Sequence, residues 1–330
     1  MNKKTIHCIL WRISLLVVLS LFLAPGSGHA QSYALSNLWS VAPGTYANQS
    51  TTHPFLETNN YTRGLAYNPV SGNVLVASRY VVNEGIPARP GIYLLNGATG
   101  VTNGNLAIDT NVVAGGTFVF SMLGVTDDGV IYSGNLVTDA NVSPFRLYRW
   151  ADESAQPELA YSGDPSENAA GITSMRRVGD SLTVRGTGTN TQILLGTYNQ
   201  YVYLMTTADG TNFTPHKILT DIAPGDSRWG LAFGAGNTFW VKQQSGGNLK
   251  CLSFDLDSNT ATNIGNYTAL ASVSGGPIGI DLARNLLAII DTGVGVHKLR
   301  LYDISDPLNP ALQGTIQSFP QANLNPNFTG

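Results

Sequence analysis

Short apolar segments alternate with turn residues along most of the chain. Five stretches share one order, in which a glycine and a short apolar strand lead through a Gly, Asn or Asp turn into a longer β-branched or aromatic strand. The glycines are Gly64, Gly124, Gly179, Gly230 and Gly279. The longer strands are expected over 73–79, 130–135, 192–197, 238–243 and 286–291. A repeat of about fifty residues lies within the period range of propellers.

A third strand follows in every repeat, because apolar and polar residues alternate there with the period of a half-buried strand. These strands are expected over 91–96, 145–150, 201–206, 248–255 and 297–303. Turn dipeptides such as Asn96-Gly97 and Asp209-Gly210 then lead into a weaker fourth strand, as over 158–162. Four antiparallel strands per repeat, each set in its own sheet, predict an all-β fold, a β-propeller with five recognisable blades.

A pair of β-sandwiches and a β-solenoid are the alternative folds. The repeat is too long for a solenoid rung and too regular for unrelated sandwich domains. The next repeat would begin near residue 330, so 323–330 resembles a linker into a missing blade. Residues 38–42 also form a predicted strand without a partner in the first repeat. We therefore expect the ring to close through that strand or to be an incomplete six-bladed ring.

The N-terminus has the layout of a signal peptide over residues 1–30. A basic segment ending at Arg12 precedes an apolar run over 13–24, and the small residues Gly28 and Ala30 follow. The apolar run is too short for a membrane span, which needs about twenty residues. The sequence thus predicts export to the periplasm or the extracellular space, with no membrane insertion after cleavage.

The predicted mature chain, residues 31–330, is expected to form a single propeller domain. Cys251 is its one cysteine, so an internal disulfide is excluded. Charged residues make up 12% of the sequence and the formal net charge is -3. This composition provides no electrostatic footprint for nucleic acid or for an anionic membrane. We expect a monomer without a cofactor, with an extracellular glycan or protein as its partner.

Five segments resemble a family of secreted bacterial propeller-like proteins that is catalogued only as a domain of unknown function. The segments are 38–44, 63–69, 148–153, 160–165 and 207–213. The resemblance covers nearly the whole predicted mature chain. It implies the propeller fold and export, and it assigns no catalytic residue. Members of the family continue past the residue at which this chain stops, which agrees with a truncated ring.

Candidate catalytic and metal-binding residues are few. The predicted mature chain has three histidines, His53, His216 and His297, and none stands in a nucleophile motif such as Gly-x-Ser-x-Gly. Residues 255–259 imitate the start of a calcium loop, but Thr260 replaces the expected glycine and the closing glutamate is missing. We interpret 255–259 as a turn between strands and predict no metal site.

One polar pattern converges on a single end of the predicted ring, where the segment entering each innermost strand meets the loop after the second strand. The second strands end in Arg79, Asn135, Thr197, Gln243 and Asp291. Arginines precede three innermost strands, and the predicted ligand-binding residues are Arg63, Arg79, Asn135, Arg228, Trp229, Gln243 and Asp291, with Arg177 nearby. Guanidinium groups bind carboxylates bidentately and aromatic faces stack on sugars or cations, which suits a carboxylated or hydroxylated glycan.

The alternative interpretation is structural. Strand ends are polar in any case, and these arginines could pair with Asp180, Asp226 or Asp291.

Two classes of function follow. The first is a secreted interaction or ligand-binding module that recognises a polar glycan at the mouth of the propeller. The second is an enzyme, a polysaccharide lyase or a metal-assisted hydrolase or lactonase, with Arg, Tyr or Asp side chains at the mouth acting on the substrate. Propellers host both classes. The absence of a catalytic motif favours the module.

Export can be tested directly. If residues 1–30 are a signal peptide, the protein recovered outside the cytoplasm begins at Gln31, because the peptidase cleaves after Ala30. Intact-mass measurement of the exported protein checks this. Exported material that still carries Met1 would contradict the prediction.

Overall fold

In the computed structural model, the chain divides into two units, Met1–Ala34 and Leu35–Gly330. The structure describes residues 33, 35–41, 53, 55–56, 61–79, 90–166, 176–244, 246–270, 275–291 and 297–319. Every described strand belongs to the second unit, and that unit alone is considered below.

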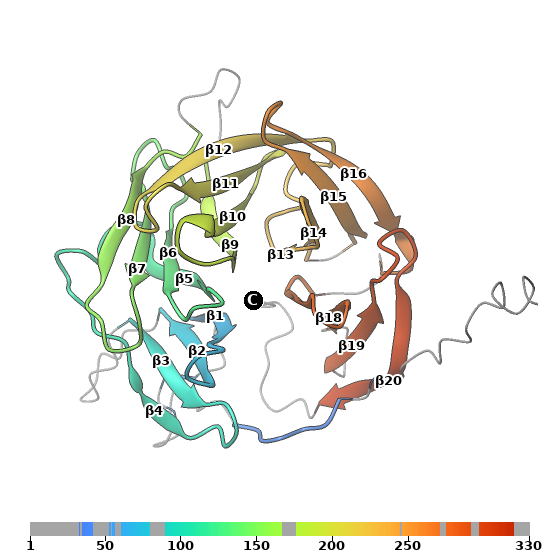
Figure 1. Cartoon of the computed structure of the whole chain (residues 1–330), viewed down its shortest axis with the longest axis horizontal. Helices are drawn as coiled ribbons and strands as arrows, with labels where there is room; N and C mark the ends of the chain where they lie inside the picture. Colours follow the sequence, from blue (N-terminus) through green and yellow to red (C-terminus); the bar gives the residue numbers. More distant parts are fainter. Residues whose placement is uncertain are drawn as a thin grey trace, which may run out of the picture. The chain divides into compact units, whose positions relative to one another are not determined.

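The second unit is built from five copies of a four-stranded antiparallel motif (Figure 1). The innermost strands are β1 (Thr62–Tyr67), β5 (Phe118–Val125), β9 (Val178–Arg185), β13 (Gly230–Phe233) and β17 (Ile278–Asp281). The second strands are β2 (Asn73–Ser78), β6 (Ile131–Leu136), β10 (Gln192–Thr197), β14 (Thr238–Lys242) and β18 (Leu286–Asp291). The third strands are β3 (Gly91–Asn96), β7 (Phe145–Trp150), β11 (Tyr201–Thr207), β15 (Leu249–Asp255) and β19 (His297–Asp303). The outermost strands are β4 (Thr102–Asn105), β8 (Glu158–Gly163), β12 (Phe213–Thr220), β16 (Thr260–Tyr267) and β20 (Ala311–Phe319).

The five motifs are the blades of a β-propeller, as the repeat predicted. Neighbouring innermost strands pack in chain order, β1 on β5, β5 on β9, β9 on β13 and β13 on β17. The prediction that each blade forms a separate sheet is wrong for blades 3 and 4. Their outermost strands β12 and β16 pair in parallel, with Leu219 opposite Thr260 and Thr220 opposite Ala261. The two blades therefore form one eight-stranded sheet.

The repeat glycines do not all begin the innermost strands. In blade 2 the strand starts at Phe118, and Gly124 lies near its end. A Cβ atom on Gly64 would lie 2.8 Å from Leu123, and one on Gly124 would lie 2.5 Å from Val184. Gly64 and Gly124 are thus required where neighbouring innermost strands approach each other closely, and their position in the strand differs between the two blades.

The hydrophobic core consists of layers between consecutive blades. Blades 1 and 2 enclose Leu75, Ile92, Phe120 and Trp150, and similar layers lie between blades 2 and 3, 3 and 4, and 4 and 5. On the other face of blade 1, Phe55 stacks on Tyr93 at a centroid distance of 4.0 Å. Because each blade has two faces to cover, second strands such as β6 and β10 are buried along nearly their whole length.

The N-terminal strand expected over 38–42 is not formed. Leu38–Val41 is described without strand structure, and Ala42 lies outside the described residues. The Trp39 side chain holds this segment instead, because its Nε1 donates a hydrogen bond to the Gly97 carbonyl at 2.8 Å. A side-chain contact to a turn of blade 1 therefore replaces the expected sheet pairing.

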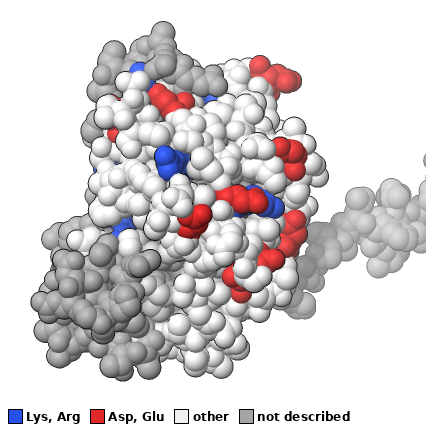
Figure 2. Space-filling model, turned by 90° about the vertical axis from the view of Figure 1, so that its left-hand side faces the viewer, with Lys and Arg blue, Asp and Glu red and all other residues white. Residues whose placement is uncertain are grey.

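The turns lie where the sequence placed them. Gly129 and Gly210 adopt left-handed backbone angles in the β5–β6 and β11–β12 turns. The stretch that imitates a calcium loop is the β15–β16 turn, in which the Asp255 carboxylate accepts a hydrogen bond from the Asp257 amide. Figure 2 shows one side of the molecule, on which acidic and basic side chains are interspersed in a largely uncharged surface.

Glu153 joins blade 2 to blade 1. Its carboxylate accepts hydrogen bonds from Asn68 Nδ2 at 2.8 Å, from Asn73 Nδ2 at 2.7 Å and from Ser71 Oγ at 2.5 Å. Asn68 and Asn73 are buried, so their amide groups depend on this carboxylate for a partner. The turn between β7 and β8 is thereby fixed to the turn between β1 and β2.

Replacing Glu153 with alanine should lower the free energy of unfolding by about 2–4 kcal/mol, because it leaves buried amide donors without their acceptor. Denaturant titration of the purified protein measures this loss. Glu158→Ala is the matched control, since Glu158 is a largely exposed partner of Arg149 and such pairs contribute about 0–1 kcal/mol. Equal losses in the two variants would contradict a special role for Glu153.

Candidate functional site at the mouth of the channel

The register of the blades brings the starts of the innermost strands next to the ends of the second strands. In blade 1, Thr62 lies opposite Ser78, and in blade 4, Gly230 lies opposite Lys242. The Arg79 amide donates a hydrogen bond to the Tyr61 carbonyl at 2.8 Å, which continues this pairing beyond β2. Arg63 and Arg79 therefore lie at the same end of blade 1.

Asp180 of β9 is the carboxylate around which the arginines gather. Arg177 donates two hydrogen bonds to it, one from Nε and one from Nη2, the latter at 2.8 Å. Arg228, from the adjacent blade, donates from Nε at 2.8 Å. Burial by itself would raise the pKa of Asp180, but the hydrogen bonds from Arg177 and the charges of both arginines outweigh it and lower that pKa. Asp180 is thus ionised at neutral pH and binds blade 3 to blade 4.

Arg63 of β1 is the arginine that Asp180 does not hold. Its guanidinium carbon lies 5.6 Å from the centroid of the Trp229 ring, over which Arg228 is also placed at 4.3 Å. Within the described part of the chain, Arg63 has no ion pair, and its buried Nε has no hydrogen-bond partner. Burial lowers the pKa of Arg63, the charge of Asp180 opposes this, and the charges of Arg177 and Arg228 lower it further. A positive charge is therefore held here without a carboxylate partner, and its Nε donor is unused.

Arg79 extends this group of positive charges. It is buried, and its guanidinium carbon lies 3.9 Å from the centroid of the Phe118 ring. Burial lowers the pKa of Arg79, and the charge of Arg63 lowers it further. We refer to Arg63, Arg79, Arg177, Arg228 and Asp180 as the arginine cluster. Four guanidinium groups face one carboxylate in this cluster, which therefore favours a further anion.

The remaining predicted residues do not join the arginine cluster. Asn135 is fully buried and fixes the start of β7, since its Oδ1 accepts a hydrogen bond from the Arg146 amide at 2.9 Å. Asp291 is buried and pairs with Arg300 at 2.6 Å. Gln243 is half-buried, and its carbonyl accepts a hydrogen bond from Lys242 Nζ at 2.7 Å. Of the seven predicted residues, the structure brings together Arg63, Arg79, Arg228 and Trp229.

The structural interpretation of the arginines holds for some of them. Arg177 and Arg228 pair with Asp180, as that alternative supposed. The other two carboxylates that it named, Asp226 and Asp291, pair instead with Lys250 and Arg300. Arg63 is left outside these pairs, so the structural explanation does not account for it.

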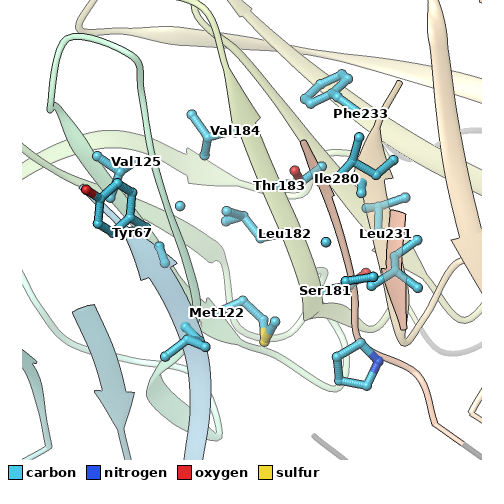
Figure 3. A pocket seen from close by; sticks show the side chains of 18 of the residues that line it. Tyr67, Met122, Val125, Ser181, Leu182, Thr183, Val184, Leu231, Phe233 and Ile280 are labelled. Carbon is cyan, nitrogen blue, oxygen red and sulfur yellow. The ribbon is translucent and has the colours of Figure 1, made fainter. Parts of the chain in front are cut away.

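The arginine cluster opens into a cavity of about 790 Å³ that is lined by the innermost strands of all five blades. Arg63 and Trp229 line one end of this channel. Beyond them the wall is largely apolar, and Leu182, Leu231 and Ile280 are among the side chains that line it (Figure 3). This lining is not among the residues predicted from the sequence, although the repeated apolar residues of the innermost strands were its signal. Alternation alone does not tell which of their two faces points to the axis.

Two further features are absent from the described ranges, a metal-binding group of side chains and a membrane-spanning helix. No group of three or more His, Cys, Asp or Glu side chains there is arranged to hold a metal ion. Among those same residues, no helix has the length and apolar character of a membrane span.

Solved structures resemble this propeller at low sequence identity. A protein of the DUF4623 family from Bacteroides eggerthii superposes with a TM-score of 0.55 at 17% identity, over 76% of this chain and 56% of that protein. This chain thus spans just over half the length of that relative. A putative TolB from Agrobacterium tumefaciens matches with a TM-score of 0.47 at 12% identity, over 81% of this chain and 91% of that one. A putative 6-phosphogluconolactonase from Bacteroides uniformis matches with a TM-score of 0.46 at 12% identity, over 75% and 68%.

The first of these similarities supports the fold alone. It agrees in kind with the resemblance noted in the sequence, because that neighbour also belongs to a family named as a domain of unknown function. Membership of this chain in such a family stays a prediction. No protein-family model matches the chain, and no curated protein matches it.

Asp180→Asn should destabilise the protein by about 3–5 kcal/mol, because removing one partner of a buried ion pair leaves the other charge uncompensated. Folding lowers the pKa of Asp180. The contribution of its ionised carboxylate to the free energy of unfolding is therefore complete above the unfolded pKa of about 3.9, and it is lost as the pH falls through the lower pKa of the folded state. The difference between wild type and Asp180→Asn should thus stay constant above about pH 5 and shrink below about pH 4.

Denaturant titrations across this pH range test the prediction. Asp281→Asn serves as the control, because its pair with Arg284 is exposed and should contribute about 0–1 kcal/mol. A wild-type advantage that is absent at neutral pH, or that grows in acid, would contradict it.

Proposed function

We propose that this protein is an exported ligand-binding module that recognises a carboxylate at the arginine cluster, and that a carboxylated glycan supplies it. The observation that carries the proposal is half-buried Arg63, whose buried Nε has no hydrogen-bond partner in the described part of the chain and which forms no ion pair there. A buried polar group without a partner costs about 1–3 kcal/mol, which an incoming carboxylate would recover by accepting its hydrogen bonds. A guanidinium group suits this task because it presents two parallel donors to a carboxylate.

The surroundings of Arg63 support the choice of an anion. The excess of positive charge in the arginine cluster attracts it, while Trp229 holds Arg63 and Arg228 over one ring. Export supports a ligand found outside the cytoplasm, and it rests on the N-terminal sequence pattern. The lyase, hydrolase or lactonase alternative has no comparable observation in its favour.

The proposal is tested by titrating an oligosaccharide of uronic acids, and a neutral oligosaccharide of the same length, into the protein by calorimetry. We expect the acidic sugar alone to bind. Arg63→Gln should weaken that binding about tenfold to a hundredfold, because a charge-assisted hydrogen bond contributes about 1.5–3 kcal/mol. Arg284→Gln is the matched control, since it removes the same charge from an exposed pair with Asp281.

Two results would count against this function. Equal binding of the acidic sugar by wild type and Arg63→Gln would show that Arg63 does not bind the carboxylate. An increase in the absorbance of unsaturated uronates during the titration would show that the protein cleaves the sugar and is a lyase.

A further inference from the structure

The wall of the channel changes character directly below the arginine cluster. On β1, Arg63, Leu65 and Tyr67 all line the cavity, as expected for alternate residues on one face of a strand. Leu65 is 69% exposed and Tyr67 is 59% exposed, so these apolar groups face open space. One strand thus presents a cation and then two apolar side chains in line along the channel.

The other blades continue this apolar wall. Met122, Leu182, Val184, Leu231 and Ile280 project into the cavity in Figure 3. The hydroxyl of Ser181 is already engaged, since it donates to the Ser227 carbonyl at 3.0 Å. A hydroxyl-rich sugar drawn into this wall would lose its hydrogen bonds to water without replacement, which is unfavourable. An aliphatic chain forms no hydrogen bonds to water, so it would lose none on entering the channel.

The two ends of the channel differ in charge. At the end opposite the arginine cluster, the lining includes Asp127 and Asp281. Arg185 also lies there, but it is occupied by Gln192 and by the Gly236 carbonyl, at 2.6 Å to each. Within the described lining, Arg63 is therefore the cation whose side chain has no hydrogen-bond partner, and it can bind a carboxylate.

From this arrangement we propose that the channel binds an unbranched alkyl carboxylate, with its carboxylate at Arg63 and its chain along the apolar wall past Leu65 toward Tyr67. The proposal rests on the carboxylate site proposed above and adds aliphatic acids to its ligands, because an alkyl chain can follow the apolar wall that a sugar would avoid. From Arg63 to Tyr67 the strand rises about 13 Å, the length of roughly ten carbon atoms. The cavity volume of about 790 Å³ is ample for such a ligand.

The test is a calorimetric titration of wild-type protein with butanoate, hexanoate, octanoate and decanoate, each below its micelle concentration. Burying one methylene group contributes about 0.8 kcal/mol, so affinity should rise about fourfold for each added methylene. Arg63→Gln should weaken binding by a similar factor at every chain length, and it should leave the gain in affinity per methylene group unchanged.

Leu65→Asn tests the wall itself. Because Leu65 is largely exposed in the channel, the substitution spares the interblade core. It should weaken decanoate binding about tenfold, since the chain would then bury an amide, and leave butanoate binding unchanged. Val142→Asn is the matched control, because Val142 is 81% exposed and does not line the cavity, and it should change neither affinity.

The outcomes separate this inference from the proposed function. Carboxylates that bind through Arg63 with the same affinity at every chain length would overturn the alkyl channel and leave the carboxylate site standing. A chain-length increment that is insensitive to Arg63→Gln would overturn both. Decanoate binding that Leu65→Asn does not weaken would place the chain elsewhere and overturn the inference.

Discussion

The stacking of apolar blade faces is the constraint on which the rest of this structure depends. A four-stranded sheet with two apolar faces is stable only when these faces are covered, and in the described chain four interblade layers cover the facing sides of consecutive blades. Stacking draws the innermost strands toward one axis, where Gly64 and Gly124 allow their close approach. The channel and the gathering of charges at its mouth both follow from that packing.

The arginine cluster shows how such packing can sustain an unfavourable arrangement of charge. Four guanidinium groups lie near the one carboxylate of Asp180, which pairs with only two of them, so their mutual repulsion is only partly offset. Aromatic rings provide the rest of the environment, since Trp229 lies under Arg63 and Arg228, and Phe118 lies under Arg79. Because blades 1, 3 and 4 each contribute, the cluster exists only in the assembled ring.

The strands and their order could be predicted from the sequence because alternation and turn residues are local signals. The residues at the starts of innermost strands, Arg63 and Arg228, could be placed for the same reason. Asn135 and Asp291 could not, because they bind the adjacent third strand of their own blade, Asn135 through the Arg146 amide and Asp291 through the Arg300 side chain. The lack of an ion pair at Arg63 could not be predicted either. It depends on which arginines, from different blades, bind the two carboxylate oxygens of Asp180.

The parallel pairing of β12 with β16 has a consequence for the arginine cluster. Blades 3 and 4 share a continuous sheet, and a backbone bridge between Val137 and Val178 also links blade 2 to blade 3. Arg177, Asp180, Arg228 and Trp229 all belong to blades 3 and 4, whereas Arg63 belongs to blade 1. Main-chain pairing thus supports the ion pairs around Asp180, so a widening of the channel would separate Arg63 from Trp229 before it broke those pairs.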